Sequence, residues 1–153
     1  MALHLGQTAP DFASQNQHGE KLALSQFAGE KNVVLVFYPF AFSRVCTGEL
    51  SEIRDHLVDL ADDSKQVLAI SCDPMFALRA FAEQDSLNFP LLSDFWPHGE
   101  VSRAYHVFNE QLGCAGRATF IVDRGGVLRW QVENDISQAR SLDDYRSALA
   151  QLR

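Results

Sequence analysis

The sequence lacks both a long apolar run and a surplus of basic residues. Its longest apolar stretch, Val33 to Phe42, has ten residues and contains Pro39, whereas a membrane-spanning helix takes about 20 residues. The 13 lysines and arginines are outnumbered by 20 acidic side chains, which gives a formal net charge of −7. Nucleic acids and anionic membrane surfaces attract basic proteins, so we expect neither among the partners of this chain.

Cysteine is also scarce. The three cysteines are odd in number, widely spaced and without a C-x-x-C pair, so they are not the framework of a secreted disulfide scaffold. The N-terminus has no basic start and no long apolar stretch, which predicts no signal peptide and a cytoplasmic location. The five histidines show no metal-ligand spacing, and we expect no metal and no cofactor.

What is present is the composition of an ordinary globular protein. The chain has 153 residues, of which 46% are hydrophobic and 22% charged. A chain of this length buries enough surface to form a core without a metal or a disulfide. We therefore predict one domain that spans residues 1–153.

Strand and helix patterns alternate along the chain. The continuous β-branched and aromatic run at 33–37 is typical of a strand buried on both faces, and 66–71 is expected to form a second buried strand. Turn residues predict hairpins over 17–24 and 119–130, and a short strand is expected at 91–92. Parallel strands with crossover helices, followed by an antiparallel edge, predict an α/β, thioredoxin-like fold with a central mixed sheet flanked by helices.

Apolar residues at spacings of three and four predict the helices. The expected stripes are Leu50, Ile53, Leu57 and Leu60 in a helix that begins near 43–46; Phe76, Ala77, Ala80 and Phe81 in a helix with Pro74 at its first position; Val101 and Tyr105 in a helix opened by Pro97; and Leu142, Tyr145, Leu149 and Leu152 in a helix with a capping box from Ser141 to Asp144.

The segment from Tyr38 to Glu49 carries the most chemical information. It joins the first central strand to the first long helix, at the edge of an open α/β sheet where sites form. Cys46 is expected in the first helical turn, where unpaired N–H groups and the helix dipole favour a thiolate. Ser43 can direct its hydroxyl toward that sulfur, and Pro39 shapes the loop without offering a competing N–H.

These residues resemble the P-x-x-x-T/S-x-x-C motif of the peroxiredoxins, with Pro39, Ser43 and Cys46 at the right spacing. Arg117, before a downstream strand, and Glu49, three residues after the cysteine, match further family positions. The resemblance runs through nearly the whole chain. Residues 89–99, continued by 104–105 and 107–110, are similar to one subgroup, the actinobacterial alkyl hydroperoxide reductase E peroxiredoxins.

The resemblance implies a thiol-dependent peroxidase that reduces hydrogen peroxide, organic hydroperoxides or peroxynitrite through a Cys46 sulfenic acid. Arg117, Ser43 and the N–H of Cys46 would hold the peroxide oxygens, and Glu49 would orient Arg117. The resembled subgroup works with one cysteine and an external thiol or a glutaredoxin- or thioredoxin-like reductant. Ser51 stands where some peroxiredoxins carry a second cysteine.

Other interpretations remain open from the residues alone. A peroxide sensor begins with the same thiolate attack, and a thioredoxin-like disulfide reductase is disfavoured by the missing C-x-x-C. Cys72 and Cys114 are expected to be packing residues, with Cys114 the better candidate for a redox partner because its loop leads to Arg117. Aromatic residues are enriched at interfaces, and we expect a homodimer that packs through Phe40, Phe42 and Trp96.

Overall fold

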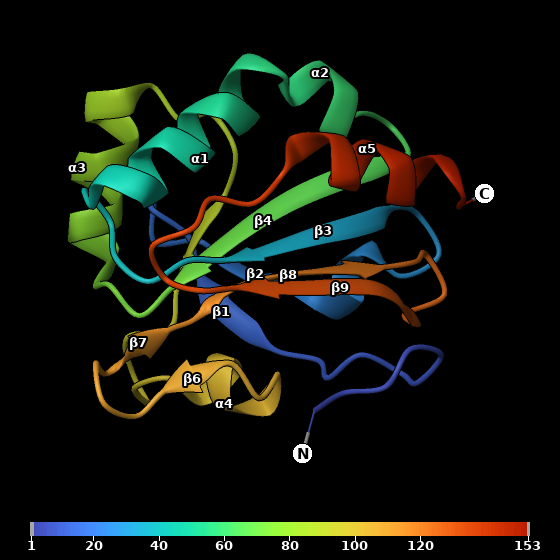
Figure 1. The fold of residues 1–153 in the computed structure, drawn as a ribbon, viewed down its shortest axis with the longest axis horizontal. Helices are drawn as coiled ribbons and strands as arrows, with labels where there is room; N and C mark the ends of the chain where they lie inside the picture. The colour runs from blue at the N-terminus through green and yellow to red at the C-terminus, as the bar shows by residue number, and fades with distance from the viewer. Residues whose placement is uncertain (1, 153) are drawn as a thin grey trace.

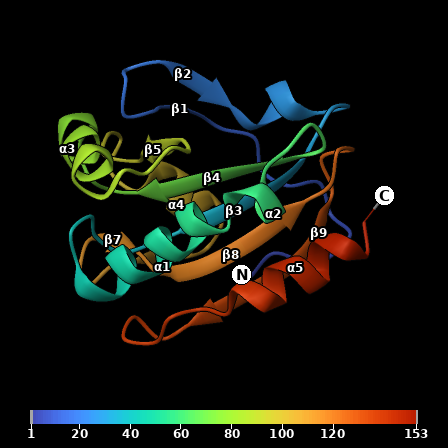
Figure 2. The same ribbon diagram turned by 90° about the horizontal axis from the view of Figure 1, so that it is seen from above.

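The computed structural model describes residues 2–152, in which seven strands form one mixed sheet with the order β2-β1-β5-β4-β3-β8-β9. Helices lie on both faces of this sheet (Figures 1 and 2). The strands of the sheet are β1 (Ala13–Gln15), β2 (Lys21–Ala23), β3 (Asn32–Phe37), β4 (Lys65–Ser71), β5 (Leu91–Ser93), β8 (Arg117–Val122) and β9 (Leu128–Asn134).

The central strands have the predicted arrangement. All six residues of β3 are buried, and β3 pairs in parallel with β4, which pairs in parallel with β5. On its other side β3 pairs antiparallel with β8, and Phe37 lies opposite Ala118. The carboxyl end of β3 therefore meets the amino end of β8, and this register brings together the two segments that carry Cys46 and Arg117.

Two layers of helices cover the sheet. The helices are α1 (Arg44–Asp55), α2 (Leu57–Leu60), α3 (Met75–Asp85), α4 (Glu100–Ala104) and α5 (Leu142–Ala150), with a 3-10 turn, η1, at Leu24–Phe27. Residues of α1, α3 and α5 share one hydrophobic cluster with β3 and β4, whereas Val101 of α4 and the N-terminal segment belong to the cluster on the other face. Figure 1 shows this division, with α4 alone below the sheet. The thioredoxin-like, central mixed sheet is confirmed.

The first helical stripe is split, so the prediction of one continuous helix was wrong. His56 has φ −118° and ψ 24°, outside the helical region, and the chain starts again as the short helix α2. Leu50, Ile53 and Leu60 are buried nonetheless, and Leu57 packs partly buried against the same cluster. The spacing of the apolar residues correctly predicted which face of the segment is buried. It did not predict the interruption at His56, because the apolar residues keep their spacing across it.

The stripe predicted for α3 was wrong in part, because only Phe81 of its four residues is buried. Phe76 is 70% exposed and Ala80 is exposed, whereas Leu78, Phe81 and Ala82 face the core. Pro74 precedes the helix rather than occupying its first position. The two apolar sets are offset by about one residue around the helix axis, and only the packing of α3 on the sheet selects between them.

Two predicted helix starts differ as well. Pro97 follows a cis peptide bond, and α4 begins three residues later, where the buried carboxylate of Asp94 accepts hydrogen bonds from the N–H groups of Val101 and Ser102. Ser141 stands at the N-cap of α5 but makes no side-chain capping bond, so the capping box is not formed.

A small two-stranded sheet was not predicted. Its strands are β6 (Phe108–Asn109) and β7 (Cys114–Ala115), each only two residues long. Strands this short carry no hydrophobic alternation, which is why the sequence pattern missed them. The segment matters because β7 leads within two residues to Arg117, the first residue of β8.

Candidate active site

Cys46 lies in the first turn of α1, where the sequence placed it. It is the third residue of the helix, directly after the loop that leaves β3, and its side chain is fully buried. Ser43 is the N-cap residue, and its carbonyl accepts a hydrogen bond from the N–H of Thr47. The sulfur is therefore held at the positive end of the helix dipole, an environment that stabilises an anion.

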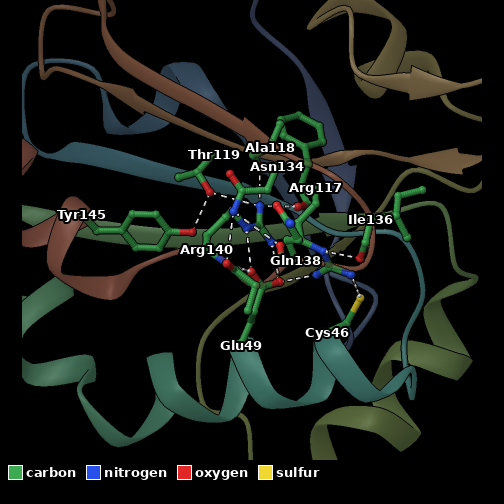
Figure 3. Close-up of polar contacts among 12 residues, drawn as sticks. Cys46, Glu49, Arg117, Ala118, Thr119, Asn134, Ile136, Gln138, Arg140 and Tyr145 are labelled. Carbon is green, nitrogen blue, oxygen red and sulfur yellow. Dashed lines mark hydrogen bonds and ion pairs between the residues drawn. The ribbon is translucent and has the colours of Figure 1, made fainter.

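Arg117 reaches this sulfur from the neighbouring strand. Its Nη2 donates to Cys46 Sγ at 3.4 Å, and its Nε donates to the carbonyl of Ile136 at 2.8 Å. The side chain is only 2% exposed, so its charge acts on the sulfur with little screening by water. The structure thus places a buried guanidinium beside the thiol (Figure 3).

Glu49 lies one turn further along α1 and contacts the same arginine. Its Oε1 accepts a hydrogen bond from Arg117 Nη1, and the carboxylate is buried. Burial opposes ionisation, but the hydrogen bonds and charge of Arg140, together with the charge of Arg117, outweigh it and lower the pKa of Glu49 below its usual value. Glu49 is therefore an anion that holds the Arg117 guanidinium from the side opposite Ile136.

Arg140 is the site residue that sequence reasoning missed. It donates to Glu49 from its backbone N–H, from Nε and from Nη2, at 2.6, 2.9 and 2.8 Å. Its Nη1 donates to the carbonyls of Phe37 at 2.6 Å and Ala118 at 2.7 Å. One buried side chain therefore joins α1, the end of β3 and the start of β8. The sequence shows only an arginine before the last helix, a place where a solvent-exposed arginine is equally common.

The network continues toward α5. Arg140 Nη1 also lies 3.1 Å from the hydroxyl oxygen of Thr119, which is 2.7 Å from the hydroxyl of Tyr145. Figure 3 shows this series of contacts from Tyr145 through Arg140 and Glu49 to Arg117 and Cys46. Each polar group in it is buried and paired, which favours a single, fixed arrangement of the guanidinium that faces the sulfur.

Pro39 and Ser43 lie in the loop between β3 and α1. Pro39 is buried, and the Ser43 hydroxyl is a buried polar atom that has no hydrogen-bond partner within residues 2–152. A buried hydroxyl without a partner is costly by about 1–3 kcal/mol, so Ser43 is a candidate for a polar contact with a bound molecule.

The other two cysteines are in different surroundings. All three thiols are free and buried. Burial, with the neighbouring charge of Asp94, raises the pKa of the Cys72 thiol to about 12. Burial also raises the pKa of the Cys114 thiol. Because the thiolate is the reactive form, neither side chain is prepared as a nucleophile.

Two further observations concern ligands and membranes. Across residues 2–152, no group of three histidine, cysteine, aspartate or glutamate side chains is arranged to hold a metal ion. Within the same range, none of the helices combines the length and the apolar character needed to cross a bilayer.

Comparison with known proteins supports the same chemistry. The model of the AhpC/TSA family matches residues 5–131. Alkyl hydroperoxide reductase E of Mycobacterium tuberculosis is 47% identical over 150 residues, which are 98% of each chain, and the 2-cysteine chloroplastic peroxiredoxin of Chattonella marina is 33% identical over 94% of this chain and 77% of its own.

Solved structures resemble the fold closely. Peroxidoxin BcpB from Mycobacterium tuberculosis superposes with a TM-score of 0.86 at 29% identity, over 99% of each chain. AhpC from Enterococcus faecalis superposes with a TM-score of 0.87 at 28% identity, over 98% of this chain and 92% of its own.

A thioredoxin-like sheet with a cysteine at the first turn of α1 and a buried arginine on its sulfur defines a peroxiredoxin, a thiol-dependent peroxidase. The chain belongs to the AhpC/TSA family, as its similarity to the mycobacterial alkyl hydroperoxide reductase E proteins also shows.

Proposed function

We propose that Cys46 is the nucleophile of this peroxidase and that its substrates are hydrogen peroxide, organic hydroperoxides or peroxynitrite. The observation that carries the proposal is the 3.4 Å contact between Arg117 Nη2 and Cys46 Sγ at the N-terminus of α1. Two sources of positive potential, a buried guanidinium and a helix end, act on one sulfur, and they favour the anionic form that attacks peroxide.

In the reaction the Cys46 thiolate attacks the terminal oxygen of the peroxide. An S–O bond forms and the O–O bond breaks. The second oxygen leaves as hydroxide or alkoxide, which takes up a proton to become water or an alcohol, or, from peroxynitrite, as part of nitrite. Sulfur is oxidised to the sulfenic acid and the peroxide is reduced. Negative charge moves from sulfur onto the leaving oxygen, so donors fixed around that path lower the barrier.

Three groups supply those donors in this proposal. Arg117 provides a guanidinium already bound to the sulfur, and the unpaired hydroxyl of Ser43 and the N–H of Cys46 lie at the same end of α1. Pro39 shapes the loop that carries Ser43. Glu49, and behind it Arg140, fixes the orientation of Arg117, so the donors are in place before peroxide arrives.

A second turnover requires that the sulfenic acid be reduced. An external thiol condenses with it, forming a mixed disulfide and releasing water, and a second thiol then releases Cys46. We propose that this thiol is a small molecule or a glutaredoxin- or thioredoxin-like protein. The raised pKa of both Cys72 and Cys114 supports an external rather than an internal partner.

The proposal also covers the location, domain organisation and oligomeric state of the enzyme. It acts in the cytoplasm, as one domain that spans residues 1–153, of which Met1 and Arg153 lie outside the described residues, and as a homodimer. The exposed aromatic side chains of Phe40, Phe42 and Trp96, at 41%, 48% and 83%, support the dimer. Trp96 also lines a groove of about 580 Å³ together with Phe76 and Phe95.

The test is mass spectrometry of Cys46 after one equivalent of peroxide, in the wild type and in a variant without Cys72 and Cys114. We expect sulfenic acid on Cys46 in both proteins. Peroxide consumption in the presence of a thiol reductant then distinguishes a peroxidase, which turns over many times, from a peroxide sensor, which stops at one equivalent. An unmodified Cys46 contradicts the proposal.

A further inference from the structure

The loop from Pro39 to Ser43, here called the active-site loop, has an uncommon backbone conformation. Phe42 has φ +69°, in the left-handed region that side chains other than glycine seldom adopt. Its ring is 48% exposed and packs at 5.1 Å from the ring of Phe81 on α3. Such a conformation costs on the order of 1–3 kcal/mol, so other contacts must hold this loop in place.

Asp73, directly after β4, supplies a polar contact of this kind. Its Oδ2 accepts a hydrogen bond from the N–H of Ala41 at 2.8 Å. Within residues 2–152 this is the only hydrogen bond that joins the backbone of residues 39–43 to an element beyond the loop and α1. The loop is therefore attached to the rest of the protein at one polar point.

Asp73 is itself fixed on two strands. Ser71, the last residue of β4, donates its hydroxyl to the same Oδ2 at 2.7 Å. Ser93, the last residue of β5, donates its hydroxyl to the Asp73 carbonyl at 2.6 Å. Ser71 thus orients the carboxylate toward Ala41, and Ser93 holds the Asp73 backbone at the end of β5.

We propose that Asp73 is a positioning residue of the peroxidase reaction, and the proposal rests on the role of Cys46 proposed above. Through Ala41, the Asp73 carboxylate holds the active-site loop in the conformation that presents Ser43 and the first turn of α1 to peroxide. Within residues 2–152 Asp73 makes no hydrogen bond to the sulfur or to Arg117, so it acts through the loop and not on the reacting atoms.

The same contact affects the two half-reactions differently. Attack on peroxide needs Ser43 and the N–H groups of α1 in fixed positions, and a displacement of about 1 Å can cost as much as 100-fold in rate. Reduction of the sulfenic acid instead needs access, because Cys46 is fully buried and an external thiol is larger than hydrogen peroxide. Loss of the Asp73 contact therefore slows oxidation and does not slow reduction.

The experiment measures both half-reactions in Asp73→Ala. Rapid alkylation and mass spectrometry follow Cys46, first with hydrogen peroxide and then, on the sulfenic acid, with glutathione. We expect oxidation to slow by roughly 10-fold or more, while the reaction with glutathione stays equal to the wild type or becomes faster. Asp73→Asn keeps an oxygen that can accept from Ala41, and it should recover most of the oxidation rate.

Asp123→Ala is the matched control. Asp123 also accepts hydrogen bonds from backbone N–H groups, those of Gly125 and Val127, but in the β8–β9 turn at the opposite end of the sheet. It should lose stability without changing the ratio of the two rates. If Asp73→Ala does not fold, Ser71→Ala, which removes one hydroxyl that orients the carboxylate, should show the same split to a smaller extent.

The outcomes separate this inference from the proposed function. Wild-type Cys46 that peroxide does not oxidise contradicts the proposed function and this inference with it. Wild-type oxidation with an unchanged rate in Asp73→Ala, or an equal fall in both half-reactions, overturns the role of Asp73 alone. A selective fall in oxidation that Asp73→Asn reverses supports it.

Discussion

Arg140 donates three hydrogen bonds to the carboxylate of Glu49, and that carboxylate in turn binds Arg117. The three buried side chains carry two positive charges and one negative charge, which leaves one positive charge beside the Cys46 sulfur. A Cys46 thiolate neutralises that charge. Buried charges are stable only when they are paired, so the network that fixes Arg117 is consistent with the role proposed for Cys46.

Replacing the proposed nucleophile should remove the activity without unfolding the protein. We expect Cys46→Ser to consume no peroxide above background, because a serine hydroxyl is not ionised at neutral pH and is a weak nucleophile. Peroxide consumption with a thiol reductant and circular dichroism are the measurements. Cys72→Ser is the matched control and should stay within about twofold of the wild type, since its buried thiol has a pKa of about 12. Substantial turnover in Cys46→Ser would mean another residue is the nucleophile.

Removing the guanidinium should slow the chemical step. We expect Arg117→Ala to lose about 2–4 kcal/mol of transition-state stabilisation, as for other oxyanion donors, which is a rate lower by roughly 30- to 1000-fold. Arg117→Lys should recover only part of the rate. Lysine restores the positive charge, but its ammonium lacks the planar fork that contacts sulfur and carboxylate together. The exposed Arg129 provides the control: Arg129→Ala should leave the second-order rate constant with peroxide unchanged. Equal second-order rate constants for Arg117→Ala and Arg129→Ala would show that Arg117 takes no part in the reaction with peroxide.

The carboxylate of Glu49 should contribute to stability in a pH-dependent way. Glu49→Gln leaves Arg140 and Arg117 buried without their counterion, and breaking a buried pair typically destabilises by about 3–5 kcal/mol. The pKa of Glu49 is lowered in the folded state, so its contribution is full above the ordinary glutamate value of about 4.3 and is lost as the pH falls through the lowered folded value.

Urea unfolding of the wild type and Glu49→Gln at pH 7 and near pH 3 tests this. The difference in unfolding free energy should be large at pH 7 and should shrink in acid. Glu52→Gln, an exposed position on the same helix, is the control and should change little at either pH. A difference between wild type and Glu49→Gln that is independent of pH contradicts the assigned charge.

The exposed aromatic residues should stabilise a dimer. A tryptophan buried at the centre of an interface commonly contributes at least about 2 kcal/mol, so Trp96→Ala should weaken dimerisation by roughly 30-fold. Sedimentation velocity at micromolar protein is the measurement, and Val58→Ala, which changes an equally exposed apolar residue on α2, should leave the dimer intact. A wild-type protein that sediments as a monomer rejects the proposed dimer.

The cycle should need only one cysteine. We expect the Cys46 sulfenic acid to persist without added thiol and to oxidise further to the sulfinic acid with excess peroxide. The double variant Cys72→Ser/Cys114→Ser should turn over within about twofold of the wild type with an external thiol, since neither side chain takes part. Quantitative formation of a Cys46–Cys114 or Cys46–Cys72 disulfide, with turnover sustained by thioredoxin alone, would show that a resolving cysteine exists.

Much of the fold could be predicted from local patterns of apolar residues in the sequence. The β-branched and aromatic run at 33–37 forms β3, and the apolar residues 67–70 lie in β4, because a strand buried on both faces needs mostly apolar side chains. The incorrect predictions concern features that tertiary packing determines. The break at His56 and the buried face of α3 depend on how each helix packs on the sheet, and the spacing of apolar residues fits more than one such packing.

The position of Cys46 at the start of a helix follows from the local sequence, since a buried strand, a loop with Pro39 and the apolar stripe of α1 follow one another within a short segment. Arg117 was found through resemblance to a family, because it lies 71 residues from Cys46. The contacts of Arg140 and Asp73 at the site are visible in the three-dimensional fold alone. Their partners Glu49 and Ala41 are 91 and 32 residues away, and only the register of strands in the sheet brings such groups together, because hydrogen bonds between distant residues leave no periodicity in the chain.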